Sequence, residues 1–222
     1  MLKSEILSTI EGAGFIAMLR IPSADDTLEM SEVLIEAGVP CIQIPLTVPG
    51  ATEVIAELRE RYASRALIGA GTVLNAKAAD ACIAAGAQFI VSPVVDSATI
   101  SQCNEAGTTV VASALTPTEA LTAWNSGADM VRIYPCGALG GPAYVKFLLA
   151  PLPQVRLLAA GGVSMQNAAD FIAAGAVALE VDSDLADLDA LRGGRKDDIV
   201  TNVHLYLDVV VEALSLAAGE TP

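Results

Sequence analysis

The sequence is poor in basic residues and in aromatic residues. Twelve lysines and arginines face 26 aspartates and glutamates, which gives a formal net charge of −14, and aromatic side chains make up 4% of the 222 residues. Nucleic acid is densely negative and is bound by a basic face, so the shortage of cations excludes a nucleic-acid partner and an anionic membrane surface. An anionic metabolite is compatible with this charge only where a few local cations form a pocket.

Features of membrane, exported and cofactor-binding proteins are also missing. No apolar run reaches the roughly 18–20 residues that span a bilayer, and the N-terminus lacks the basic start and apolar stretch of a signal peptide. Gly69-Ala70-Gly71 lacks the further glycine of a dinucleotide fingerprint, so we expect no cofactor. The four cysteines show no CxxC spacing, which predicts reduced thiols in a cytoplasmic protein: Cys41, Cys82, Cys103 and Cys136.

A short repeat organises the chain. Five helix-like segments end in a small residue and a glycine, and each is followed by an apolar run: Ala37-Gly38, Ala85-Gly86, Ala106-Gly107, Ser126-Gly127 and Ala174-Gly175. A glycine that ends a helix in the left-handed conformation and is followed by a buried strand fits this pattern. The repeat therefore predicts alternating helices and strands.

Eight strand-like runs lie between the helical patterns. Alternating helices and strands favour a parallel sheet with helices outside, and eight units in this length favour a single (β/α)8 barrel spanning residues 1–222 over a doubly wound open sheet. We expect an acidic loop over Asp182–Asp198 and a last helix over Asp197–Ala218. The predicted strands are Ile16–Arg20, Cys41–Leu46, Leu67–Gly71, Gln88–Ser92, Thr109–Ser113, Met130–Tyr134, Arg156–Ala159 and Val177–Val181.

Arg132 is the most unusual residue of the predicted strands. Alternation places Val131 and Ile133 on one face, and Met130, Arg132 and Tyr134 on the other. A buried cation is costly unless it is paired or takes part in chemistry. In such barrels reactive groups lie at the carboxyl ends of the strands, so Arg132 is a candidate site residue.

Several motifs together resemble the 2-keto-3-deoxy-6-phosphogluconate (KDPG) and 4-hydroxy-2-oxoglutarate (KHG) aldolases. The resemblance implies a homotrimeric barrel that cleaves a 2-keto acid to pyruvate and an aldehyde. It covers nearly the whole chain through Met18-Leu19-Arg20, Ile44-Pro45-Leu46-Thr47-Val48-Pro49, Ile68-Gly69-Ala70-Gly71-Thr72-Val73, Ile90-Val91-Ser92-Pro93, Leu115-Thr116-Pro117-Thr118-Glu119, Gly140-Gly141-Pro142-Ala143-Tyr144-Val145-Lys146 and Gly161-Gly162-Val163.

The resemblance also exposes departures in the residues that carry chemistry. Arg132 takes the place of the family's Schiff-base lysine, and Gln43 takes the place of its acid/base glutamate. A guanidinium stays protonated and forms no productive imine, and an amide exchanges no proton at neutral pH. Gly161 and Gly162 of the phosphate-binding turn are kept, but Ala160 replaces a threonine, and Glu180 and Asp182 replace small residues. Carboxylates there would repel a phosphate.

We therefore expect a protein that lacks Schiff-base activity and binds a 2-keto acid or another carboxylate at the barrel mouth. An active lyase on an unphosphorylated keto acid remains the alternative. Arg132 and Glu180 belong to alternate strands and are expected to share a layer, so an inert ion pair, a carboxylate site and a metal site using Glu180 and Asp182 all stay open, although no metal is expected. The remaining expected ligand-binding residues are Arg20, Thr47, Thr72, Pro93, Gly161 and Gly162.

Overall fold

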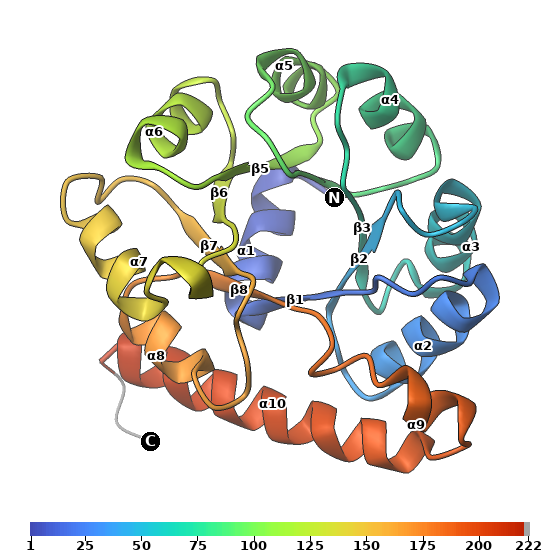
Figure 1. Cartoon of the computed structure of the whole chain (residues 1–222). Helices are drawn as coiled ribbons and strands as arrows, with labels where there is room; N and C mark the ends of the chain where they lie inside the picture. The colour runs from blue at the N-terminus through green and yellow to red at the C-terminus, as the bar shows by residue number, and fades with distance from the viewer. Residues whose placement is uncertain (220–222) are drawn as a thin grey trace.

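The computed structural model describes residues 1–219 and shows eight parallel strands closed into a barrel (Figure 1). Each strand pairs with the next in chain order, and the first pairs with the last. The predicted (β/α)8 barrel is confirmed, and the open doubly wound sheet is wrong. The strands are β1 (Phe15–Met18), β2 (Cys41–Pro45), β3 (Leu67–Gly71), β4 (Phe89–Ser92), β5 (Thr109–Ala114), β6 (Met130–Ile133), β7 (Leu157–Ala160) and β8 (Ala178–Val181).

Helices surround the barrel and alternate with its strands, as Figure 1 shows. Their first turns are fixed by side-chain caps where the sequence supplies them: Ser23, Asn75 and Asp96 each accept a hydrogen bond from a backbone N–H of the first turn. The helices are α1 (Lys3–Ala13), α2 (Ala24–Glu36), α3 (Ala51–Tyr62), α4 (Ala76–Ala84), α5 (Ser97–Glu105), α6 (Pro117–Asn125), α7 (Pro142–Leu149), α8 (Ala168–Ala173), α9 (Leu188–Arg192) and α10 (Lys196–Ala217).

The glycines of the sequence repeat end helices as predicted. All five have a positive φ, from 67° at Gly107 to 104° at Gly175, which is the left-handed region that side chains with a Cβ rarely adopt. Each chain reversal is therefore set by a local signal, and the following strand starts within a few residues. This is why the number and order of the elements are readable from the sequence.

Helix α1 was not predicted and closes one end of the barrel. In Figure 1 it lies behind the ring of strands. Ile6 and Ile10 are buried in one apolar cluster with barrel-interior side chains, among them Phe89 and Met130. Its apolar signal is short, with Ile6, Leu7 and Ile10 on one stretch, and it precedes the first glycine of the repeat. The barrel is thus open at the carboxyl ends of its strands only.

The acidic segment before the last helix is more ordered than expected. The predicted loop over Asp182–Asp198 contains α9, whose N-terminus is capped by the Asp187 side chain through the Ala190 N–H at 2.8 Å. Arg192 at the end of α9 binds Asp26 of α2 at 2.6 Å. The expectation of one long loop is therefore wrong, because a capping aspartate and an inter-helix ion pair hold the segment.

The predicted last helix over Asp197–Ala218 is confirmed as α10, Lys196–Ala217, and this helix is strongly apolar. By length and composition alone it would cross a bilayer, so the expectation that no segment qualifies was too strict. In the fold it runs along the outside of the barrel beside α2 and α8 (Figure 1). Val203, Tyr206, Val210 and Ala213 are buried against the apolar core. Packing against the core therefore explains why this face of α10 is apolar.

Candidate functional site

Side chains inside the barrel form layers that change character toward the open end. The lower layer is apolar and continuous with Ile6 and Ile10 of α1. Above it lie four buried polar residues, Gln43, Ser113, Arg132 and Glu180, each at most 5% exposed. Val131 and Ile133 pack instead against the helices, so the predicted alternation of β6 is confirmed. Polar chemistry is thereby concentrated at the carboxyl ends of the strands.

Arg132 is held by two partners, one on the neighbouring strand β5 and one on β8, two strands away. Its Nη2 binds Glu180 Oε1 of β8, and its Nη1 donates to Ser113 Oγ at 3.1 Å. Ser113 is directly opposite Arg132 in the β5–β6 register and donates in turn to the backbone carbonyl of Ser92 at 2.7 Å. The ion pair inferred from the alternate strands is present, and a serine not singled out in the sequence completes it.

Tyr134 covers the guanidinium from the open end. The Arg132 Cζ lies 4.2 Å from the centre of the Tyr134 ring, a close cation–π contact. Tyr134 follows the end of β6 and is 38% exposed, so its ring lies between Arg132 and solvent. Tyr134 was not among the expected site residues, although it lies two positions beyond Arg132 and on the same predicted face.

Three buried polar atoms around this pair have no hydrogen-bond partner. They are Arg132 Nε, Glu180 Oε2 and Gln43 Oε1. Gly71 makes room for Gln43, since a Cβ at position 71 would lie 2.3 Å from Gln43 Nε2. A buried donor or acceptor without a partner costs about 1–3 kcal/mol, so one donor and two acceptors beside the mouth are left unsatisfied by the fold.

The mouth contains two adjoining compartments that share Arg20 and Tyr134. We name the first, of about 160 Å³, the Gln43 compartment; it is lined by Gln43, Thr47, Thr72, Val91, Pro93 and Arg132. We name the second, of about 260 Å³, the Asp182 compartment; it is lined by Met18, Gly161, Gly162, Val163, Glu180, Asp182 and Ser183. All ten residues predicted for the site therefore line one of the two compartments.

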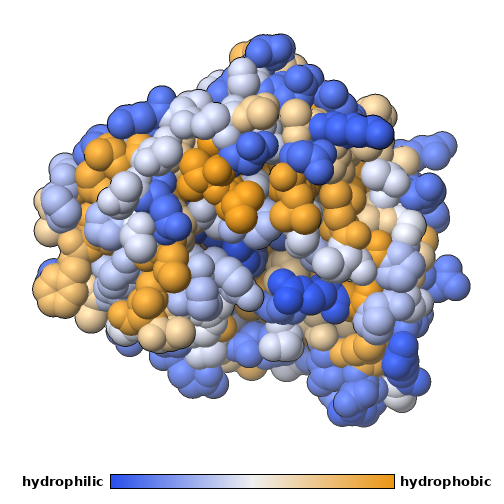
Figure 2. Space-filling view, turned by 45° about the horizontal axis from the view of Figure 1, so that its top comes forward, coloured by the Kyte–Doolittle hydropathy of each residue, from blue (hydrophilic) through white to orange (hydrophobic). Residues whose placement is uncertain are grey.

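Figure 2 shows the corresponding hollow in the molecular surface, with hydrophilic residues at its floor and hydrophobic residues along part of its rim. Strand β1 ends at Met18, two residues earlier than predicted, so Arg20 lies beyond its end. The Arg20 side chain reaches the rim of the hollow. Gly161 is placed against the Tyr134 ring, which a Cβ at position 161 would approach to 2.9 Å. The site is thus shaped by glycines as well as by polar groups.

The four charged side chains of the mouth balance one another. Arg20 and Arg132 oppose Glu180 and Asp182, and Arg20 forms no salt bridge among residues 1–219. Asp182 is exposed at the rim but closely surrounded. Burial raises the pKa of Asp182, Arg20 offsets part of the rise, and Glu180 adds to it. In a chain with net charge −14, the free Arg20 makes this the place where a small anion meets a cation.

The mouth contains no lysine. Lys3 binds Asp129 at 2.7 Å, and Lys196 binds Glu29 at 2.6 Å, both outside the barrel. Lys77 belongs to α4 and Lys146 to α7. A covalent imine needs an amine within reach of the bound carbonyl, and none of the described lysines lines the mouth.

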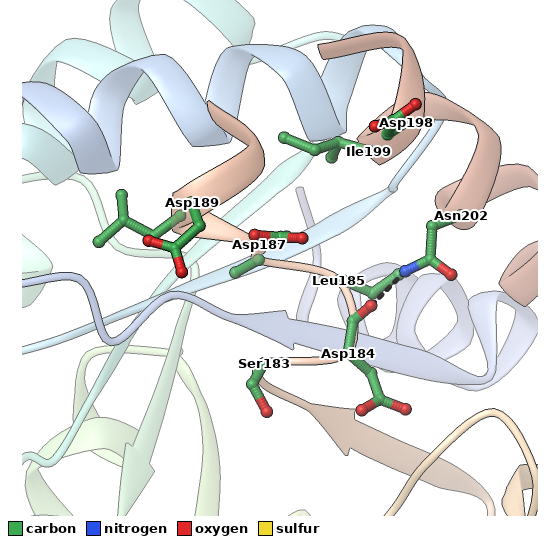
Figure 3. Close-up of a pocket in the computed structure, with 10 residues that line it drawn as sticks. Ser183, Asp184, Leu185, Asp187, Asp189, Asp198, Ile199 and Asn202 are labelled. Carbon is green, nitrogen blue, oxygen red and sulfur yellow. Dashed lines mark hydrogen bonds between the residues drawn. The ribbon is translucent and has the colours of Figure 1, made fainter. Parts of the chain in front are cut away.

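A further pocket of about 390 Å³ lies between the end of β8, α9 and α10 (Figure 3). Three of its four aspartates are engaged in structure: Asp184 accepts from the Met165 N–H at 3.0 Å, Asp187 caps α9, and Asp198 pairs with Arg195 at 3.2 Å. Among residues 1–219, no three His, Cys, Asp or Glu side chains form a group that holds a metal.

Most of the chain matches one protein family. The family model for KDPG and KHG aldolase matches residues 6–202, which is most of the chain and all eight strands. Among curated relatives, the 2-dehydro-3-deoxy-6-phosphogalactonate aldolase of Escherichia coli (strain K12) is 39% identical over 171 residues, covering 77% of this chain and 83% of the relative. The 2-dehydro-3-deoxy-phosphogluconate aldolase of Treponema pallidum (strain Nichols) is 31% identical over 168 residues, covering 76% and 80%.

Solved structures give the same result. A native KDPGal structure superposes with a TM-score of 0.81 at 34% identity, covering 90% of this chain and 96% of that one. A porous protein cage designed by fusing symmetric oligomeric domains superposes with a TM-score of 0.82 at 34% identity, covering 93% and 75%. The backbone of the barrel is therefore shared with these proteins.

Proposed function

Because the chain belongs to the KDPG and KHG aldolase family, we propose that it binds a small 2-keto acid or another carboxylate at the barrel mouth without Schiff-base chemistry. The observation that carries the proposal is the place of Arg132, which stands on β6 inside the mouth and is engaged by Glu180 and Ser113. Its guanidinium supplies positive charge and a free N–H, and no nucleophilic amine.

The loss of the amine and of the proton-transferring group supports the absence of aldol chemistry. An arginine stays protonated at any physiological pH, so its nitrogens do not attack a carbonyl. Gln43, at the acid/base position, donates and accepts hydrogen bonds without exchanging a proton at neutral pH. Removing a covalent nucleophile from an enzyme costs up to about a million-fold in rate.

Carboxylate binding is supported by the donors of the Gln43 compartment. Arg20 has no ion-pair partner among the described residues, Arg132 Nε is unpaired, and the hydroxyls of Thr47 and Thr72 line the same space. Hydrogen bonds between a guanidinium and a carboxylate are among the stronger ones in proteins. A carboxylate held here would place its neighbouring keto oxygen beside the Gln43 amide.

Trapping and binding measurements test the proposal together. Borohydride with pyruvate should give no covalent adduct, and pyruvate should raise the melting temperature of the native protein. The matched variant is Arg20→Gln, which keeps a polar side chain and removes the free cation; it should abolish the shift. A pyruvyl adduct detected by mass spectrometry would overturn the proposal.

A second candidate function is a lyase that cleaves an unphosphorylated keto acid without a lysine. The free Arg20 and the paired Arg132 favour it, because two fixed cations can stabilise an enolate by electrostatics alone. Release of pyruvate from a panel of 2-keto acids separates the two functions. Catalytic release of pyruvate by the native protein would establish the lyase.

We also propose that the protein assembles as a homotrimer in the cytoplasm, as the family resemblance implies. Phe147 of α7, 75% exposed in the isolated chain, supports a contact between copies. An apolar ring of this size gains free energy when it is covered.

A further inference from the structure

The two compartments of the mouth differ in what they offer to a ligand. The Gln43 compartment presents donors and cations on the side of Thr47, Thr72 and Arg132. The Asp182 compartment presents two carboxylates, Glu180 and Asp182, beside the shared Arg20. A ligand that spans both compartments therefore meets donors at one end and acceptors at the other.

Glu180 is the decisive acceptor. It is 5% exposed, its Oε1 binds Arg132, and its Oε2 has no partner although it is buried. An ionised carboxylate only accepts hydrogen bonds, so a ligand satisfies Oε2 by offering an O–H or N–H. The shortage of a donor is intrinsic to the site, because neither Gln43 nor Ser113 is bonded to Oε2.

We propose that the Asp182 compartment takes an uncharged, hydroxylated tail of the ligand, and that Glu180 and Asp182 are specificity-determining residues that reject a phosphorylated tail. This inference rests on the proposed carboxylate binding and names the substrate class: an unphosphorylated polyhydroxy acid. Sugar hydroxyls donate to the two carboxylates, whereas a phosphate carries about −1.5 to −2 charges at pH 7 and mainly offers acceptors. Like charges brought together at a binding site weaken binding strongly.

The size of the compartment agrees with such a tail. Its volume of about 260 Å³ exceeds severalfold the ~30 Å³ that one water occupies in the liquid, so a short chain of hydroxylated carbons fits. The glycines of the turn, Gly161 and Gly162, leave the wall free of side chains next to Tyr134. Backbone shape is therefore kept for a ligand, while Glu180 and Asp182 place two carboxylates beside it.

Calorimetry on the full-length native protein tests the inference with pyruvate, D-gluconate, D-galactonate and 6-phosphogluconate as probes. At least one unphosphorylated aldonate should bind about tenfold or more tightly than both pyruvate and 6-phosphogluconate. Asp182→Ser should reduce that preference over 6-phosphogluconate by about fivefold or more. Asp189→Asn, which removes one negative charge from exposed α9 outside the mouth, is the matched control and should leave the ratio unchanged.

The outcomes separate this inference from the proposed function. If pyruvate binds, and 6-phosphogluconate binds as tightly as the two aldonates or more tightly, the hydroxylated-tail inference alone is overturned. Pyruvate binding that neither aldonate improves has the same effect. Failure of all four probes to bind overturns the proposed function and the inference with it. The Asp182 carboxylate accepts no hydrogen bond from another residue among residues 1–219. Asp182→Ser is therefore expected to fold normally, which circular dichroism verifies.

Discussion

Arg132 of β6 and Glu180 of β8 form a buried ion pair in which each partner keeps one polar atom unsatisfied. Arg132 stands at the position where the family resemblance implies a Schiff-base lysine. Separating the two side chains costs free energy, because each would then be a buried charge without a partner. The pair is thus both a structural element and the floor of the candidate site.

The first prediction concerns the stability that depends on this pair. Arg132→Met should lower the free energy of unfolding by about 3–5 kcal/mol, because Glu180 is left buried without its cation. Arg132→Met combined with Glu180→Leu should lose much less than the sum of the single changes. Urea titration of the four proteins measures the coupling. The exposed pair Arg192–Asp26 is the control, and Arg192→Met should cost under ~1 kcal/mol.

The second prediction concerns restoring a lysine. Arg132→Lys should not give a borohydride-trapped pyruvate adduct, because Glu180 beside the new amine favours its protonated form. Adding Gln43→Glu leaves that obstacle in place. The triple variant Arg132→Lys, Gln43→Glu, Glu180→Gln should form an adduct that mass spectrometry detects. An adduct in Arg132→Lys alone would show that the Glu180 argument is wrong.

The third prediction concerns the pH dependence of stability. A carboxyl group whose pKa is higher in the folded state favours folding while it is protonated, and this contribution is lost as the pH rises through the folded pKa. Burial raises the pKa of Asp182, so ionised Asp182 disfavours the folded state at neutral pH. Asp182→Asn should therefore raise the melting temperature slightly at pH 7, and the gain should shrink toward the ordinary aspartate pKa of about 3.9.

The same scan with Asp189→Asn provides the control for net charge. Removing any negative charge from a chain at −14 relieves some general repulsion, but Asp189 lies on α9 outside the mouth. The difference between the two variants isolates the effect of the site. Equal curves for both variants would mean that Asp182 experiences no special environment.

The fourth prediction concerns the thiols. Burial raises the pKa of Cys41 to about 12 and those of Cys82, Cys103 and Cys136 to about 11. Since the thiolate is the reactive form, a thiol reagent at pH 8 should label the native protein very slowly and all four cysteines after unfolding. Rapid labelling of Cys136 in the native protein would contradict this and indicate a reactive thiol just beyond the end of β6.

The fifth prediction concerns assembly. Light scattering after gel filtration should give a mass three times that of the 22.7 kDa chain. Phe147→Ser should shift the mass toward the monomer without changing the far-ultraviolet circular dichroism, if Phe147 is covered by a second copy. Leu205→Ser on exposed α10 is the matched control, being 52% exposed on another element. A monomeric native protein would contradict the trimer.

Most of the fold was readable because its signals are local. The five repeat glycines and the apolar runs gave all eight strands to within a few residues. Helix α1 was not predicted because its two isoleucines are buried only through contacts with barrel-interior residues that lie far away in the sequence. Helix α9 escaped because its five residues lie in an acidic segment whose order depends on the Arg192–Asp26 pair.

The candidate site was readable as a set of positions but not as a network. Family motifs and strand ends located all ten expected residues, and the alternate-strand argument paired Arg132 with Glu180. Ser113 and Tyr134 were missed because their roles follow from register across β5 and β6 and from the path of the chain after β6. The division of the mouth into two compartments likewise depends on how far Arg20 and Tyr134 reach inward.

Helix α1 closes the barrel at the end opposite the candidate site. Any molecule that reaches Arg132 has entered past Tyr134 and Arg20 and must leave by the same route, since Ile6 and Ile10 fill the opposite end. Entry and exit of a bound molecule therefore share one opening, and a molecule seated against Arg132 blocks that opening to the next one.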